Sequence, residues 1–145
     1  MRTDVLLDTG PFVAYLWLRD RYHDWAVQTL DELEARLITC EPVLTEACFL
    51  TARNRLPAAR VLEPFERGRI LLGLEIKNEA PAIRALMQRY ADVPMSLADA
   101  CLVRMAEMTG LPICTMDADF AIYRTHGRRP LTLITPGPAR YVHEA

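Results

Sequence analysis

Short apolar runs alternate with helix-like segments along the whole chain, and this alternation limits most strongly how the chain can fold. We expect strands within five segments: Val5–Leu7, Leu37–Cys40, Ile70–Ile76, Pro112–Thr115 and Leu131–Ile134. Such short apolar runs are typical of strands that are buried on both faces. Strands separated by helices need right-handed crossovers, which produce a parallel sheet covered by helices on both sides. The sequence therefore predicts an α/β fold, a three-layer α/β/α sandwich around a mostly parallel five-stranded sheet.

Proline, serine and glycine mark the ends of the helices between these runs. Pro11 and Pro42 each follow a strand and are suited to the first turn of a helix. Ser96 can cap the start of a helix that Gly110 ends. We expect helices at about Phe12–Leu18, His23–Arg36, Val43–Arg53, Leu56–Glu66, Ala80–Tyr90, Ser96–Gly110 and Asp117–Tyr123.

The length and composition are those of one ordinary globular domain. With 145 residues we expect a single domain over residues 1–145, and the apolar fraction of 51% and charged fraction of 25% agree with this. No stretch approaches the roughly 20 continuous apolar residues of a membrane span. The N-terminus also lacks the apolar region of a signal peptide. We therefore expect a cytoplasmic protein that has no contact with a membrane.

The charge of the chain limits how it could bind nucleic acid. A formal net charge of −2 excludes a polycation that coats nucleic acid indiscriminately. One of the 17 basic residues, Lys77, is a lysine and the other 16 are arginines. The planar fork of arginine suits phosphate recognition, although a GC-rich genome produces the same bias. Binding would therefore need a local patch, with candidates Arg53, Arg55, Arg124, Arg128 and Arg129.

The cysteines do not indicate a zinc site or a disulfide framework. Cys40, Cys48, Cys101 and Cys114 form no C-x-x-C pair, and each is embedded in apolar sequence. None of the three histidines is spaced with a cysteine as in a zinc site. This pattern predicts buried, reduced thiols.

Four acidic residues lie where the predicted strands and helices would bring them together: Asp8, Glu46, Asp99 and Asp117, with Asp119 close by. Each follows an apolar strand-like run or lies in the first turn of a helix. These positions form the ligand-binding edge of an open parallel sheet. Gathered carboxylates repel one another unless a positive charge lies between them. The cluster therefore predicts a divalent metal site.

Each acid also has an ordinary structural explanation. Asp8 can be a turn residue or a helix N-cap, and Glu46 can interact with the positive end of its helix. Asp99 has the capping-box spacing from a serine three residues earlier. One of Asp117 and Asp119 can cap a short helix while the other is a ligand, and we favour Asp117 as the ligand. Four acids at equivalent positions indicate a shared site more strongly than any one of them.

Three other functions share part of this pattern. The triplet Asp8-Thr9-Gly10 matches the nucleophilic loop of aspartic proteases, but that fold is all-β and the helix signals contradict it. A phosphatase acting on small phosphates would use a similar metal site, yet a second carboxylate two residues after Asp8 is missing. A module that binds RNA or protein without cleaving it agrees with the structural roles of the single acids.

The order Asp, Glu, Asp, Asp on an α/β chain of this size resembles the PIN domain and, within it, the VapC-like toxin ribonucleases. The resemblance extends over nearly the whole chain and rests on a set of short motifs. The matching segments are Leu6-Leu7-Asp8-Thr9-Gly10-Pro11-Phe12-Val13-Ala14, Val43-Leu44-Thr45-Glu46-Ala47, Ser96-Leu97-Ala98-Asp99-Ala100 and Thr115-Met116-Asp117-Ala118-Asp119-Phe120.

This resemblance implies a five-stranded parallel sheet, Mg²⁺ or Mn²⁺ in a carboxylate pocket, phosphodiester hydrolysis, homodimers and often an antitoxin partner. Carried over by position, the acidic quartet is Asp8, Glu46, Asp99 and Asp117, and Thr9 and Thr115 match hydroxyl positions near the metal. The metal ligands would come from Asp8, Asp99 and Asp117, with Asp119 as the alternative to Asp117. Independently of the resemblance, Arg53 lies two turns after Glu46 on the same helix face, where it could contact a substrate phosphate or be solvated.

Together these observations predict a metal-dependent endoribonuclease, the toxin of a toxin–antitoxin pair. Its substrate would be single-stranded or looped RNA, because the bases are accessible there. The alternative is a PIN-like module that binds RNA or a protein partner without cleavage.

Overall fold

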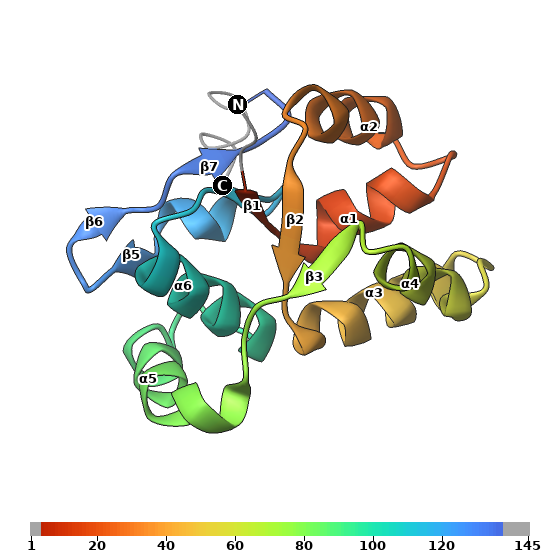
Figure 1. Cartoon of the computed structure of the whole chain (residues 1–145). Helices are drawn as coiled ribbons and strands as arrows, with labels where there is room; N and C mark the ends of the chain where they lie inside the picture. The colour runs from red at the N-terminus through yellow and green to blue at the C-terminus, as the bar shows by residue number, and fades with distance from the viewer. Residues whose placement is uncertain (1–3, 138–145) are drawn as a thin grey trace.

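A five-stranded parallel sheet forms the centre of the computed structural model, which describes residues 4–137 (Figure 1). The strand order is β3-β2-β1-β4-β7, and every neighbouring pair is parallel. The strands are β1 (Asp4–Leu7), β2 (Arg36–Thr39), β3 (Ile70–Leu72), β4 (Ile113–Cys114) and β7 (Leu133–Ile134). Val5, Leu6 and Leu7 of the central strand are fully buried, as expected of a strand covered on both faces. The predicted fold class is confirmed.

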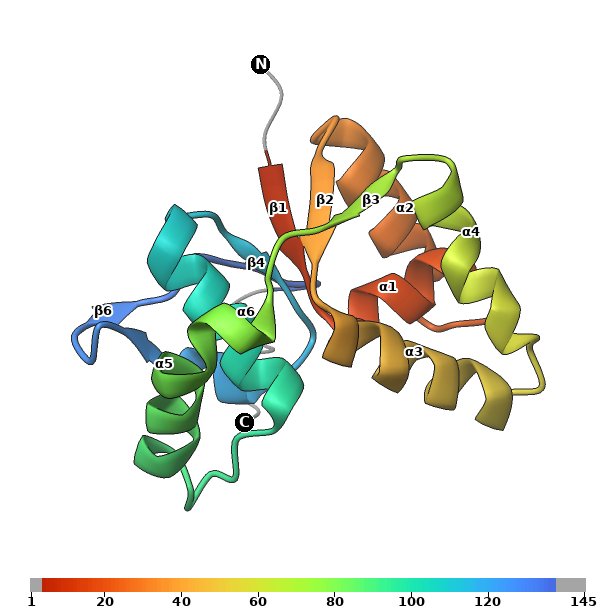
Figure 2. The ribbon, with the colours of Figure 1, turned by 60° about the horizontal axis from the view of Figure 1, so that its bottom comes forward.

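Helices cover both faces of this sheet. They are α1 (Thr9–Leu16), α2 (His23–Glu32), α3 (Glu41–Arg53), α4 (Glu63–Glu66), α5 (Ile76–Arg89) and α6 (Leu97–Thr109), with 3-10 helices η1 (Ala58–Leu62) and η2 (Ala118–Ala121). Figure 2 shows α1 and α2 on one side of the sheet and α5 and α6 on the other. Helix α3 contacts both α1 and α6 and so joins the two layers at one end of the strands.

The first two helices differ from the predicted bounds at their ends. Helix α1 begins at Thr9 instead of Phe12, because the Asp8 side chain accepts a hydrogen bond from the Thr9 backbone N–H and caps the helix there. The prediction that the next helix runs to Arg36 was wrong. Helix α2 ends at Glu32, and Glu34 adopts φ +47°, which turns the chain into β2.

The predicted helix from Leu56 to Glu66 was also wrong in type. The chain forms the 3-10 helix η1 and then the single turn α4, with Pro57 and Pro64 at their starts. Proline lacks the N–H that a continuous α-helix needs, so the segment breaks into two short pieces. The helix predicted at Asp117–Tyr123 is likewise the short 3-10 helix η2.

Helix α5 is longer than predicted, because it begins at Ile76 instead of Ala80 and contains Pro81. Pro81 and Lys77 are both exposed, so water can bond the carbonyl that the missing N–H leaves unpaired. The helix before the last acid motif was predicted more accurately. Helix α6 starts after Ser96 and ends before Gly110, which adopts φ +71°.

A two-stranded hairpin was not predicted at all. Strands β5 (Arg124–Thr125) and β6 (Arg129–Pro130) pair antiparallel and pack beside α6. Two consecutive residues with positive φ, His126 at +52° and Gly127 at +70°, form its tight turn. Glycine after a polar residue is the sequence signal of such a turn.

The prediction of four buried thiols is confirmed for three of the cysteines. All four are free; Cys40, Cys101 and Cys114 are buried, and Cys48 is half-buried. None of the helices between residues 4 and 137 is both long and apolar enough to span a lipid bilayer.

Candidate active site

The four predicted acids line one cavity of about 220 Å³ at the carboxyl ends of the central strands. Asp8 follows β1, Asp117 follows β4 at a distance of three residues, and Glu46 and Asp99 come from α3 and α6. The remaining lining residues are Thr9, Gly10, Leu50 and Met116. The chain leaves β1 toward β2 on one side and returns to β4 on the other, so the cavity lies at the topological switch point of the sheet.

Asp8 is the most deeply buried of these acids, with 7% of its surface exposed. Its Oδ1 accepts a hydrogen bond from the Thr9 backbone N–H at 2.7 Å, and its Oδ2 accepts one from Thr115 Oγ1 at 2.7 Å. Both bonds favour the charged form. Burial outweighs them and, with the negative charges of Asp99 and Asp117, raises the pKa of Asp8 from 3.8 to about 7. Asp8 therefore needs a nearby positive charge to be fully ionised at neutral pH.

Thr115 connects two of the acids through its buried hydroxyl. Its Oγ1 donates to Asp8 and accepts a hydrogen bond from the Asp117 backbone N–H at 2.9 Å. Asp117 Oδ1 in turn accepts from the Asp119 backbone N–H at 2.9 Å, which makes Asp117 the N-cap of η2. The loop after β4 is thus fixed to the end of β1 by side-chain hydrogen bonds.

Glu46 lies in the second turn of α3, not in the first turn as predicted, because the helix already begins at Glu41. Burial is the main cause that raises its pKa, and the negative charge of Asp99 adds to it. The Thr9 hydroxyl is close enough to lower that pKa, yet it makes no hydrogen bond of normal geometry with another residue in the described range. The lining of the cavity therefore includes a buried hydroxyl near Glu46 that could bond a ligand.

Asp99 is both a helix cap and a cavity residue. Its Oδ2 accepts from the Ser96 backbone N–H at 3.1 Å, and Ser96 Oγ accepts from the Asp99 N–H at 3.1 Å. The capping box predicted from the sequence is therefore present. Burial is the main cause that raises the pKa of Asp99, and the negative charge of Asp117 adds to it.

Tyr123 is a residue of this region that the sequence did not indicate. It is fully buried, and its hydroxyl donates a hydrogen bond to Asp99 Oδ2 at 3.3 Å. Burial and the negative charge of Asp99 raise the pKa of the Tyr123 hydroxyl, so it remains a donor. Tyr123 therefore positions Asp99, and its only sequence signal is an aromatic residue after a short helix.

Three other predicted residues, Asp119, Arg53 and Arg124, lie outside the cavity wall. Asp119 does not line it; burial, and then the charge of Asp117, raise the pKa of Asp119. The Arg53 guanidinium lies 5.7 Å from the centre of the exposed Phe49 ring, farther along α3. Arg124 donates hydrogen bonds to the carbonyls of the three preceding residues and so has a structural role.

The donors of the cavity suit a hard divalent cation, since they are carboxylate and hydroxyl oxygens. Between residues 4 and 137 no three His, Cys, Asp or Glu side chains form a ready set of metal ligands. Mg²⁺ commonly uses one or two carboxylates and keeps several waters, so it does not need such a set. The mutual repulsion of the acids and the unbonded Thr9 hydroxyl agree with this kind of site.

Comparison with known proteins agrees with the fold and identifies the family. The crystal structure of FitAcB from Neisseria gonorrhoeae superposes with a TM-score of 0.50 at 23% sequence identity, covering 79% of this chain and 88% of that one. No curated protein matches the sequence. The sequence pattern of the PIN domain matches residues 5–125, which contain all four acids of the cavity. The chain therefore belongs to the PIN domain family.

Proposed function

We propose that this protein is a metal-dependent endoribonuclease that hydrolyses RNA phosphodiester bonds. The observation that carries the proposal is the convergence of four carboxylates, from four separate parts of the chain, on one cavity. Members of the PIN domain family are generally nucleases, which agrees with this chemistry. We further propose a single PIN-like domain over residues 1–145 that works in the cytoplasm as a homodimer.

The proposed ligands of Mg²⁺ or Mn²⁺ are Asp8, Asp99 and Asp117, in part through water. Such an ion supplies an activated water and neutralises charge on the phosphate. Thr115 holds the Asp8 carboxylate through its hydroxyl, and Tyr123 holds that of Asp99. These bonds fix both carboxylates before substrate arrives, so little rearrangement is needed during the reaction.

Glu46 and Thr9 have a different proposed role from these ligands. Glu46 has no hydrogen bond of normal geometry that would tie it to a helix cap, and burial raises its pKa, which makes it a better proton acceptor. We assign Glu46 to orienting the attacking water and accepting its proton. The free hydroxyl of Thr9 would then bond a phosphate oxygen or this water.

The proposed substrate is single-stranded or looped RNA, because its bases and backbone can enter an open cavity. The resemblance to VapC-like toxin ribonucleases supports a second proposal, that a small antitoxin protein binds over the acidic cavity. A toxin of this kind would be inactive while its partner is bound.

An RNA cleavage assay tests the proposed activity. Purified protein should cleave single-stranded RNA with Mg²⁺ or Mn²⁺, lose the activity in EDTA and regain it when the metal is added back. The double variant Asp8→Asn, Asp99→Asn should be inactive, whereas Asp92→Asn, at an exposed acid outside the cavity, should keep full activity. Cleavage that survives both chelation and the double substitution would contradict the proposal.

The same assay decides between the two aspartates of the last motif. Asp117→Asn should abolish cleavage, and Asp119→Asn should reduce it less, because only Asp117 lines the cavity. Equal losses in the two variants would assign both residues to the metal site.

A second candidate is a PIN-like module that binds RNA or protein without cleavage. The capping roles of Asp8, Asp99 and Asp117 favour this candidate, because these acids have a structural function without any metal. Calorimetric titration with Mn²⁺ separates the two functions. The nuclease should show a binding site that the double variant lacks, and the binding module should show none.

A further inference from the structure

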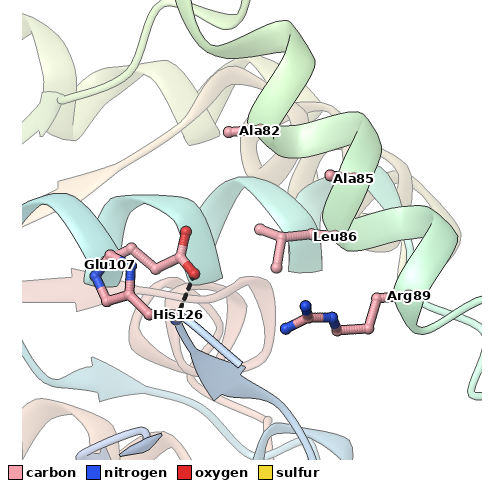
Figure 3. A pocket seen from close by; sticks show the side chains of 6 residues that line it. All are labelled: Ala82, Ala85, Leu86, Arg89, Glu107 and His126. Carbon is pink, nitrogen blue, oxygen red and sulfur yellow. Dashed lines mark hydrogen bonds between the residues drawn. The ribbon is translucent and has the colours of Figure 1, made fainter. Parts of the chain in front are cut away.

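A second and larger cavity, of about 390 Å³, lies between α5, α6 and the β5–β6 turn (Figure 3). Its lining residues are Ala82, Ala85, Leu86, Arg89, Glu107 and His126. It shares none of these residues with the acidic cavity. Ala82 and Ala85 have small side chains, so the charged side chains surround an open space.

Arg89 is the cation of this cavity, and it has no partner within the described part of the chain. No hydrogen bond or ion pair joins its guanidinium to another residue between 4 and 137. The guanidinium lies against Gly127 of the hairpin turn, where a Cβ atom would collide with it. In Figure 3 the Arg89 side chain extends from α5 toward the turn that carries His126. Because Gly127 has no side chain, the Arg89 guanidinium can lie against this turn.

Glu107, the acid of this cavity, forms its bonds away from Arg89 and shares the guanidinium of Arg104 with Glu79, which lies 2.8 Å from Arg104 Nε. Glu107 Oε1 accepts a hydrogen bond from Arg104 at 3.2 Å, and its Oε2 accepts the His126 backbone N–H at 2.7 Å. Its side chain is only 8% exposed. Because Glu107 is occupied on both oxygens, the charge of Arg89 remains free for a ligand. The guanidinium of Arg89 is therefore the group of this cavity that can bind an anion.

The surroundings of this cavity point to a phosphate of nucleic acid. Arg128 and Arg129 are exposed on the same hairpin. The hairpin also begins beside the acidic cavity, because Tyr123 bonds to Asp99 immediately before β5. Eight residues of α6 separate Asp99 from Glu107, about 12 Å along the helix axis. A strand that has one phosphate at the acids could thus reach Arg89 within a few nucleotides.

We propose that the Arg89 pocket binds a backbone phosphate of RNA, a few nucleotides from the bond at the acidic cavity. This inference rests on the proposed function, since it names how the substrate of that site is held. Four acids repel the phosphates of RNA, and the whole chain has a net charge of −2, so affinity has to come from a local cation. The fork of Arg89 can bond two phosphate oxygens at once.

Binding of labelled single-stranded RNA in EDTA tests the pocket without any cleavage. Arg89→Gln should weaken binding several-fold and lower the slope of log affinity against log salt concentration by about 1. Arg84→Gln is the matched control, because Arg84 is also exposed on α5 but does not line the pocket. Arg89→Lys should keep the salt slope and recover part of the affinity. Equal binding by the Arg89→Gln and Arg84→Gln variants, or no RNA binding by the unchanged protein, would overturn the proposal.

A second pair of variants leaves Arg89 in place and changes the wall of the pocket. Ala85→Glu puts a carboxylate beside Arg89 and should weaken RNA binding, whereas Ala80→Glu makes the same change on α5 outside the pocket. Ala85→Glu binding RNA as tightly as Ala80→Glu would contradict the proposal. The acidic peptide oligoglutamate offers a further comparison. If Arg89→Gln weakens binding of this peptide but not of RNA, the proposal is also contradicted.

These measurements are independent of the cleavage assay. A protein that binds RNA through Arg89 but never cleaves it would overturn the proposed nuclease and leave the phosphate pocket standing. A protein that cleaves RNA but whose RNA binding does not depend on Arg89 would contradict only the proposed phosphate pocket.

Discussion

Asp8 is an acid whose surroundings favour its neutral form. Its pKa is about 7 in the folded chain and near 3.8 in the unfolded chain. Between these values the folded state holds a proton that the unfolded state has lost, so the free energy of unfolding falls as pH rises from about 4 through about 7. In EDTA we expect the melting temperature to fall over this pH range. A melting temperature that rises steadily from pH 4 to pH 8 would contradict this assignment.

The variant Asp8→Asn isolates this effect. At about 1.4 kcal/mol per pKa unit, the charged form of Asp8 costs on the order of 4 kcal/mol well above pH 7. Asp8→Asn should therefore melt at a higher temperature than the unchanged protein at pH 8 in EDTA, and Asp92→Asn should not. Mn²⁺ should raise the melting temperature of the unchanged protein and have little effect on Asp8→Asn. A lower melting temperature for Asp8→Asn at pH 8 would show that its hydrogen bonds outweigh the charge.

The role of a single residue could be predicted where that residue both caps a helix and lines the shared cavity. Asp8 caps α1 and lines the cavity, and Asp99 closes a capping box and lines it too. Tyr123 was missed, because its bond to Asp99 spans 24 residues and depends on how η2 turns the chain. No local sequence pattern encodes such a contact.

At the scale of elements, the start of α6 both stabilises the fold and positions Asp99. Ser96→Ala removes the hydroxyl that accepts the Asp99 N–H, which should lower the free energy of unfolding by about 1 kcal/mol. Ser96→Thr keeps a hydroxyl at this position and should retain most of the free energy of unfolding. Urea unfolding measures the difference, with Thr45→Ala on the exposed face of α3 as the control. Equal stability of the Ser96→Ala and Thr45→Ala variants would show that the cap contributes little.

The strands were predicted better than the helix ends for a physical reason. Each core strand is a short apolar run, and the register of β1 against β2 and β4 follows from its burial. Helix ends depend on single caps and on positive φ values, such as the one at Glu34, which composition does not encode. The hairpin at His126 and Gly127 was missed because its two-residue strands, Arg124–Thr125 and Arg129–Pro130, contain no apolar run. That omission concealed the Arg89 pocket.

At the scale of the whole molecule, the strand order decides where chemistry can occur. The order β3-β2-β1-β4-β7 places the ends of β1 and β4 next to each other, and Asp8 and Asp117 follow them. The alternation of strands and helices was sufficient to predict this edge and the four acids on it. The hydrogen bond from the Thr115 hydroxyl to Asp8 could not be predicted, because it joins residues 107 positions apart and needs the side-chain geometry of the folded chain. The four acids form a site that a metal ion and its waters would complete.

The central claim is that these four acids form one metal-dependent cleavage site. The most direct test is the initial rate of cleavage of one single-stranded RNA at saturating Mn²⁺ by the variants Asp8→Asn, Glu46→Gln, Asp99→Asn and Asp117→Asn, with Asp92→Asn as control. We expect each of the four to lose roughly 100-fold or more, as removal of a group that stabilises a transition state does, and the control to match the unchanged protein. Rates within a few-fold of the unchanged protein for any two of the four would contradict the account.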